Sequence, residues 1–157
     1  MDEISFKILK ILQKKARIPN VEVARQVALA PSAVLERIRK LEKQGIIEGY
    51  EVRLNPKYFT KSLVAFVTVK IKPGNKGDRV GETLAAIESV QEVHLVAGDD
   101  AYLVKLRAAD PHELGQIVRH RIAGIKGVQS TRTVIALETV KETARIPIDE
   151  NKEGKTT

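Results

Sequence analysis

The spacing of the apolar residues changes near residue 62, and this change limits the possible folds more than any other feature. Up to Gln44, apolar residues recur every three or four positions, as they do on amphipathic helices. From Leu63 to Ile71 every second residue forms an apolar face, which is typical of a half-buried strand. We therefore expect two domains of different class in one chain.

The first half predicts three short helices and a strand. Asn20 is placed to cap the second helix, Pro31 to begin the third, and Gly45 to end the third helix after Gln44. Residues 46–54 then predict a short strand. The first helix buries the stripe formed by Ile4, Ile8, Ile11 and Leu12.

The second half predicts the order β-α-β-β-α-β. With right-handed crossovers, this order gives one antiparallel sheet that carries both helices on one face. The fold class is therefore α+β, with an N-terminal winged helix-turn-helix domain and a C-terminal ferredoxin-like (ACT-like) domain. The expected boundaries are 1–61 for the first domain, 62–141 for the second and 142–157 for a polar tail.

The other face of this sheet is also expected to be apolar. Its residues are Val64, Phe66, Leu103, Val134 and Ala136. An exposed apolar face of this size usually marks an interface, so we expect a homodimer and possible larger rings. The alternative is a monomer that covers this face with its own tail.

The positive charge of the chain is concentrated in the first domain. Residues 1–61 hold 13 Lys and Arg against 7 Asp and Glu, whereas the remainder holds 14 against 13. Basic side chains displace the counterions condensed on phosphate, so the charge indicates double-stranded DNA as a partner. The alternative from charge alone is a surface that favours solubility.

The third helix is the predicted DNA-binding element. Its outward face carries Ser32, Ala33, Glu36, Arg37, Arg39, Lys40 and Lys43. Arginine can bind guanine, glutamate can accept from cytosine, and small residues allow close approach to the major groove. Lys40 and Lys43 are expected at phosphates. The alternative is a solvated face with Glu36–Lys40 and Arg39–Lys43 pairs.

The sequence does not predict an enzyme, a cofactor or a metal site. It contains no cysteine, and its histidines, His94, His112 and His120, lack metal-ligand spacing. No nucleophile elbow, phosphate loop or dinucleotide motif occurs. No apolar run is long enough to span a membrane, and the acidic start is unlike a secretory signal. We expect a cytoplasmic protein.

Several segments resemble the Lrp/AsnC (leucine-responsive, feast/famine) transcription regulators. The resemblance rests on residues 20–24 and 35–50, and on Leu54-Asn55-Pro56, His94-Leu95-Val96 with Gly98-Asp99, and Thr131-Arg132-Thr133. It implies an N-terminal DNA-binding domain and a C-terminal effector and assembly domain. It also implies dimers that associate into octamers or other multiples and bind amino acids between dimers.

Two segments depart from the family pattern. Ala28-Leu29-Ala30 replaces the usual Gly-Leu-Ser, which removes a capping hydroxyl. The turn that begins at Gly98 usually has an aromatic residue and then an aspartate, where this chain has Asp100 and Ala101. The effector-binding residues implied by the resemblance are Gly98, Asp99, Asp100 and Tyr102, without a specified amino acid. The alternative is that Asp99 and Asp100 are simple turn residues.

The expected function is sequence-specific regulation of transcription, modulated by an amino acid that shifts the assembly state. Each dimer would present two recognition helices to successive major grooves, about 34 Å apart. The alternative is a nucleoid-type architectural protein that binds DNA with little sequence preference and no effector. Both alternatives place the protein at the nucleoid.

Overall fold

The computed structural model describes residues 1–74, 79–98 and 101–148. The chain divides into two compact units. The first contains Met1–Arg53 together with the C-terminal segment Glu142–Thr157, and the second contains Leu54–Lys141. The C-terminal segment therefore belongs with the first unit, although it follows the second unit along the chain.

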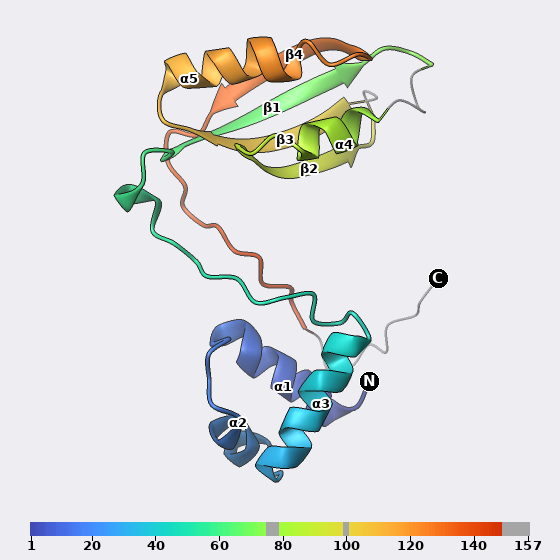
Figure 1. The fold of residues 1–157 in the computed structure, drawn as a ribbon, viewed down its shortest axis with the longest axis vertical. Helices are drawn as coiled ribbons and strands as arrows, with labels where there is room; N and C mark the ends of the chain where they lie inside the picture. The colour runs from blue at the N-terminus through green and yellow to red at the C-terminus, as the bar shows by residue number, and fades with distance from the viewer. Residues whose placement is uncertain (75–78, 99–100, 149–157) are drawn as a thin grey trace. The chain divides into compact units, whose positions relative to one another are not determined.

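The first unit consists of three helices, α1 (Glu3–Lys14), α2 (Asn20–Val27) and α3 (Pro31–Lys43) (Figure 1). Each helix supplies one apolar stripe to a small shared core, because the apolar residues recur at helical spacing. The fully buried residues at its centre are Ile8, Val23 and Val34. The expected set of three helices is thus confirmed.

The helix ends explain the sharp turn between α2 and α3. Ala28 adopts a left-handed conformation with φ of 54°, and its N–H donates to the carbonyl of Ala24. Pro31 is the first residue of α3, as expected. Asn20 is not the cap of α2: Pro19 holds that position in extended backbone, and the helix already begins at Asn20.

The strand expected at residues 46–54 is not formed in this chain. The N–H groups of Ile46 and Ile47 both donate to the carbonyl of Leu41, at 2.9 and 3.3 Å, which closes the end of α3. Gly45 permits this closure with φ of +68°. The residues that follow run without ladder partners among the described residues, so strand geometry has nothing to stabilise it.

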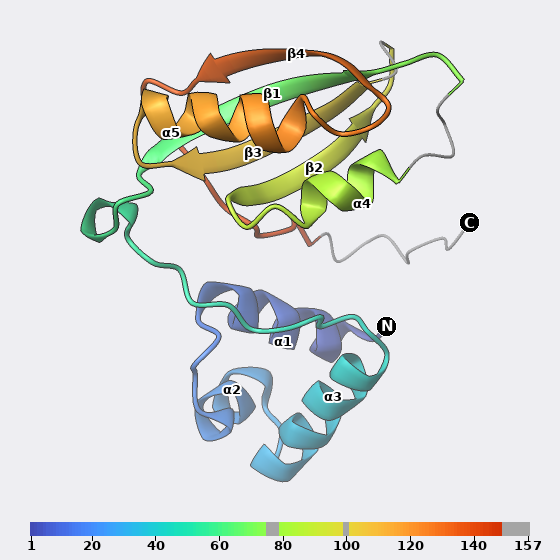
Figure 2. The same cartoon turned by 45° about the horizontal axis from the view of Figure 1, so that its top comes forward.

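The second unit is the expected β-α-β-β-α-β arrangement. Its elements are β1 (Leu63–Ile71), α4 (Val80–Ala85), β2 (Val90–Val96), β3 (Ala101–Ala108), α5 (Pro111–Gln116), the π-helical turn η2 (Ile117–Ile122) and β4 (Val128–Ile135). A short 3-10 helix, Pro56–Tyr58, precedes them. The sheet order is β2-β3-β1-β4, with all neighbours antiparallel. Figure 2 shows α4 and α5 on one face.

The strand register separates a covered face from an open face. Ala65, Val67 and Val69 are fully buried in the core that includes Leu84 and Ile122 from the helix side. On the opposite face, Phe66 lies beside Lys105 of β3 and Val134 of β4. Val64 is buried, Val134 is 50% exposed, and Phe66, Leu103 and Ala136 are half-buried.

A charged cluster borders this open face. Lys105 donates to Glu92 at 2.9 Å, and the imidazole of His94 lies 3.3 Å from the other oxygen of the same carboxylate. The hydrogen bond from Lys105 is the main reason that the pKa of Glu92 lies below its usual value. The apolar strip on the open face is therefore flanked by a fixed, polar edge.

Candidate nucleic-acid interface and effector region

The outward face of α3 gathers most of the predicted DNA-binding residues. Val34, Ile38 and Leu41 are buried on the inner face. Ser32, Glu36, Arg39, Lys40 and Lys43 are exposed, whereas Ala33 and Arg37 are half-buried. This separation follows from the helical period, which places positions three and four apart on the same side.

Three cations on this face have no competing partner in the part of the chain that the structure describes. Arg39, Lys40 and Lys43 make no hydrogen bond or ion pair with any residue in the described ranges. A helix face of this size fits the major groove, where guanidinium and ammonium groups meet base edges and phosphates. Among the described residues, no internal contact has to break before these three side chains meet a ligand.

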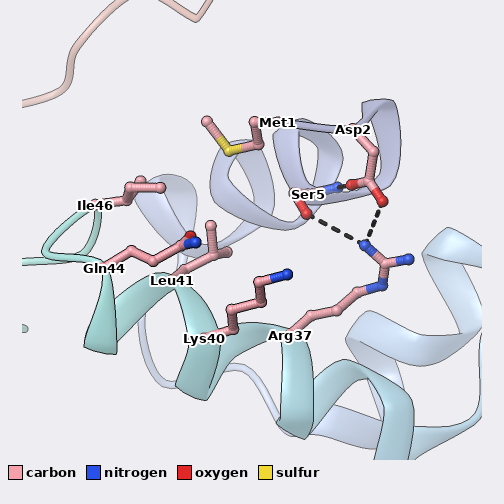
Figure 3. Close-up of a pocket in the computed structure, with 8 residues that line it drawn as sticks. All are labelled: Met1, Asp2, Ser5, Arg37, Lys40, Leu41, Gln44 and Ile46. Carbon is pink, nitrogen blue, oxygen red and sulfur yellow. Dashed lines mark hydrogen bonds and ion pairs between the residues drawn. The ribbon is translucent and has the colours of Figure 1, made fainter.

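Arg37 has a different environment from the other basic residues of α3 (Figure 3). Its Nη1 atom donates to Oδ2 of Asp2 and lies 3.3 Å from Oγ of Ser5. Asp2 also caps α1, since its Oδ1 accepts from the N–H of Ser5 at 2.9 Å. Arg37 thereby connects α3 to the first turn of α1.

This network also sets the charge state of Asp2. Hydrogen bonds from Ser5 and then from Arg37 hold the pKa of the Asp2 carboxyl far below its usual value. A carboxylate at the N-terminal end of α1 is favoured by the helix dipole, but no local sequence pattern indicates Arg37 as the partner of Asp2. The two residues are 35 positions apart, and periodicity within one helix carries no information about such a pair.

A shallow pocket of about 550 Å³ lies between the start of α1 and the C-terminal half of α3 (Figure 3). Met1 and Ile46 form apolar walls over Leu41, and Lys40 and Gln44 form a polar side. The Asp2–Ser5–Arg37 network closes the remaining side. The pocket therefore combines apolar surface with Lys40, a cation on α3 that has no partner among the described residues.

The segment after α3 is held against the end of that helix. The hydroxyl of Tyr50 donates to Glu42 at 2.9 Å. Burial, followed by this contact with a carboxylate, raises the pKa of Tyr50 to about 12. The phenol thus stays protonated as a donor, and the contact ties Tyr50 to Glu42 near the end of α3.

The predicted effector turn is only partly described. Asp99 and Asp100 lie outside the described residues. Gly98 has φ of +116°, a conformation that favours glycine, and Tyr102 is half-buried in β3. The ring of Tyr102 packs against α4, because a Cβ atom added to Gly81 would lie only 2.9 Å from its Cε1.

Two features of the second unit were not indicated by the sequence. The helix that begins at Pro111 changes to π-helical geometry over Ile117–Ile122, a form that is often found at functional sites. Lys61, just before β1, donates to Ser89 at 3.3 Å and lies 3.6 Å from Glu113 of α5. Lys61 thus ties the residues just before β1 to Ser89 and to α5 within the second unit.

Two further properties bear on function. Within the described ranges, no three His, Cys, Asp or Glu side chains are grouped so that they could hold a metal ion. None of the described helices combines the length and the hydrophobicity needed to cross a lipid bilayer.

Comparison with known proteins agrees with both units. The model of the Lrp/AsnC ligand binding domain matches residues 64–146, and that of a winged helix-turn-helix DNA-binding domain matches residues 1–48. The leucine-responsive regulatory protein of Escherichia coli K12 is 39% identical over 150 residues. The aligned region covers 94% of this chain and 92% of the relative.

Solved structures show the same architecture. The transcriptional regulator NMB0573 of Neisseria meningitidis, in complex with L-Met, has a TM-score of 0.84 and 29% identity, covering 94% of this chain and 96% of its own. The feast or famine regulatory protein Rv3291c of M. tuberculosis, complexed with L-methionine, has a TM-score of 0.85 and 30% identity, covering 92% and 97%. These matches cover both domains of the chain, which therefore belongs to the Lrp/AsnC family of transcriptional regulators.

Proposed function

We propose that this protein is a sequence-specific DNA-binding regulator of transcription whose assembly responds to an amino acid. The observation that carries the DNA-binding role is the row of cations on α3, opposite its buried stripe, that have no partner in the described ranges. Arg39 is the candidate for base recognition, and Lys40 and Lys43 are candidates for phosphates. Ser32, Ala33 and Glu36 lie nearer the start of the helix, where close approach to base edges is possible.

Arg37 is the least favoured of the predicted DNA contacts. Its guanidinium already donates to Asp2 and Ser5, so a DNA contact would require an internal ion pair to be shared or broken. We propose that Arg37 mainly holds α3 in place against α1. Its contribution to DNA affinity would then be indirect.

The open face of the sheet is the proposed dimer interface. Its apolar strip, which includes Phe66 and Val134, is left without a cover by the helices of its own unit. A two-fold dimer would supply two copies of α3, one for each of two successive major grooves about 34 Å apart. Further association into octamers or other multiples is part of the same proposal.

The second unit is the proposed effector-binding part. Two similar structures are complexes with L-methionine, which makes a free amino acid the favoured class of ligand. Gly98, Asp99, Asp100 and Tyr102 are the candidate residues. An effector would act by binding one assembly state more tightly than another, because equal affinity shifts no equilibrium. The proposed location is the cytoplasm, at the nucleoid, and the proposal assigns no catalytic activity.

An architectural role is the second candidate. It is favoured by the lysines of α3, which bind phosphate without sequence preference, and by the departure of Asp100 and Ala101 from the family pattern. In this alternative the protein would bind DNA broadly and ignore amino acids.

Selection of duplexes from a random DNA pool tests the regulator against this alternative. A regulator should enrich a two-fold symmetric sequence and bind it at least about 10³-fold more tightly than random DNA. Weak binding to all sequences would favour the architectural role. An Arg39→Ala, Lys43→Ala double variant is the control for binding through α3, and it should lose the enrichment.

A thermal-shift screen against the twenty amino acids tests the effector. A ligand at about 100 times its dissociation constant should stabilise the fold by about 2.7 kcal/mol, which is easily measured. A single hit would identify the effector. A blank screen with intact DNA binding would contradict the amino-acid response.

A further inference from the structure

The C-terminal segment contacts α1 through the main chain of one residue. The side-chain amide of Gln13 donates from Nε2 to the carbonyl of Ile146 at 3.1 Å. The N–H of Ile146 donates in turn to Oε1 of Gln13 at 2.8 Å. Both polar groups of one peptide residue are therefore paired with both polar atoms of one side chain, as in a strand ladder.

The local sequence prepares Ile146 for this contact. Pro147 follows it, and a residue that precedes proline is restricted to extended backbone. Thr143 accepts from the N–H of Arg145 at 3.1 Å, which orders the segment just before the contact. The side chain of Ile146 is 74% exposed, so its main chain makes the contact.

Gln13 is suited to this role because a primary amide both donates and accepts. A glutamate at this position could still accept from the N–H of Ile146 but would repel its carbonyl oxygen. Gln13 is half-buried and follows Leu12, which packs in the core, so its backbone is held firmly by α1. The amide is therefore presented from a rigid support.

We propose that residues 142–148 form an intramolecular clasp on α1, centred on the Gln13–Ile146 pair. The chain runs from the first unit to the sheet unit and returns to the first unit at Glu142. We call the first unit the DNA-binding unit and the second the sheet unit. With the clasp closed, the chain connects the two units twice, where it enters the sheet unit at Leu54 and where it leaves it after Lys141. With the clasp open, only the connection at Leu54 remains.

The consequence for regulation rests on the proposed DNA-binding function. Two tethers restrict the positions that a DNA-binding unit can reach more than one tether does, which raises its effective concentration at a correctly spaced second half-site. Because the clasp is one pair of neutral hydrogen bonds at the surface, it can open and close readily. It gives the sheet unit a second route by which to control the DNA-binding unit.

Limited proteolysis of the full chain tests the clasp without any DNA. Trypsin cleaves the Arg145–Ile146 bond only when Ile146 is released, because the protease must enclose the main chain on both sides of this bond and the clasp holds the N–H and the carbonyl of Ile146 against Gln13. We expect Gln13→Glu and Gln13→Ala to speed the appearance of the product that ends at Arg145 about three- to tenfold. Gln116→Glu introduces the same charge on α5, where Gln116 is exposed, and should leave the rate unchanged.

Equal rates in the parent and both Gln13 variants would overturn the clasp, provided that the variants show the parent's circular dichroism. Equal acceleration in Gln116→Glu would also overturn it, because the effect would then come from charge alone. Neither result depends on whether the protein binds DNA, so failure of the clasp is distinguishable from failure of the proposed function.

DNA binding then tests the regulatory consequence. The duplex selected from the random pool is compared with the same duplex in which one half-site is scrambled. We expect Gln13→Ala to lose about three- to tenfold in affinity for the paired sites and less than twofold for the single site. Equal losses on both duplexes, or no loss on either, would overturn the coupling between the clasp and paired-site recognition.

Discussion

Arg37 of α3 and Asp2, the cap of α1, form an ion pair that joins α3 to the N-terminal turn of α1. Ser5 is part of both contacts, since its N–H donates to Asp2 and its hydroxyl lies near Arg37. Because side chains at 33% and 51% exposure are screened by water, the pair contributes modest stability. Its main effect is to fix the position of α3 relative to α1.

The stability of the first unit should depend on the charge of Asp2. The pKa of Asp2 in the folded protein lies below its unfolded value, so its stabilisation is present above about pH 4 and is lost as the pH falls below it. Asp2→Asn keeps a capping oxygen but removes the charge. It should lower the free energy of unfolding at pH 7 by up to about 1 kcal/mol.

Thermal melts from pH 7 to pH 2 measure this difference. The parent and Asp2→Asn should converge as the carboxyl is protonated. Glu48→Gln, an exposed carboxylate with no ion pair among the described residues, is the charge control. A gap between parent and Asp2→Asn that persists undiminished at pH 2 would show that the charge is not the cause.

The salt dependence of DNA affinity should distinguish the cations of α3 that contact DNA from Arg37, which is paired with Asp2. Lys40→Ala should weaken DNA binding and reduce the slope of log affinity against log salt by about 1, because one phosphate contact is lost. Arg39→Ala should also weaken binding, with an added loss of preference for the selected sequence. Arg37→Gln should reduce the melting temperature while leaving the salt slope near that of the parent.

Fluorescence anisotropy over a range of salt concentrations gives all three slopes. A reduced slope for Arg37→Gln would show that its guanidinium reaches a phosphate despite Asp2. Unchanged affinity in both Arg39→Ala and Lys40→Ala would place the DNA-binding surface elsewhere.

The sequence was most informative where one local pattern determines the structure. The alternation from Leu63 to Ile71 predicted β1 with its buried face, and Pro31 marked the start of α3. The prediction for the cap of α2 was wrong because a neighbouring residue occupies the cap position. Asn20 is a good cap by residue type, but Pro19 already supplies extended backbone at that position.

Contacts between distant residues were beyond the reach of periodicity. The Asp2–Arg37 and Gln13–Ile146 pairs join segments that no local pattern relates. The prediction of a strand at residues 46–54 was wrong for a related reason. A local pattern of apolar residues shows that a segment can form a strand, but the strand also needs a second strand with which to form hydrogen bonds. The π-helical turn at Ile117 has no recognised sequence signal.

The open face of the sheet predicts how the protein associates. Phe66→Asp should break the proposed dimer, because a carboxylate would be buried in an apolar contact between copies. Sedimentation velocity should then show a monomer. His112→Asp places the same charge on an exposed position of α5 and should keep the parent's assembly. An unchanged sedimentation coefficient for Phe66→Asp would contradict the interface on this face.

The contact between Gly81 and Tyr102 predicts that α4 and β3 are packed too closely to admit a larger residue at position 81. Gly81→Ala adds a methyl group 2.9 Å from Cε1 of Tyr102, so the ring or α4 must shift. The overpacking should cost about 1–3 kcal/mol of unfolding free energy, which exceeds the usual gain of up to about 1 kcal/mol from alanine in a helix.

A double-variant cycle isolates this contact from other effects of the substitution. Tyr102→Leu removes the ring atoms nearest Gly81, so Gly81→Ala should cost less in that background than in the parent. Gly115→Ala on α5 is the matched control, because its added methyl would meet only the flexible end of Arg119 at 3.7 Å and should be neutral or stabilising. If Gly81→Ala costs the same in both backgrounds, the strain does not come from Tyr102.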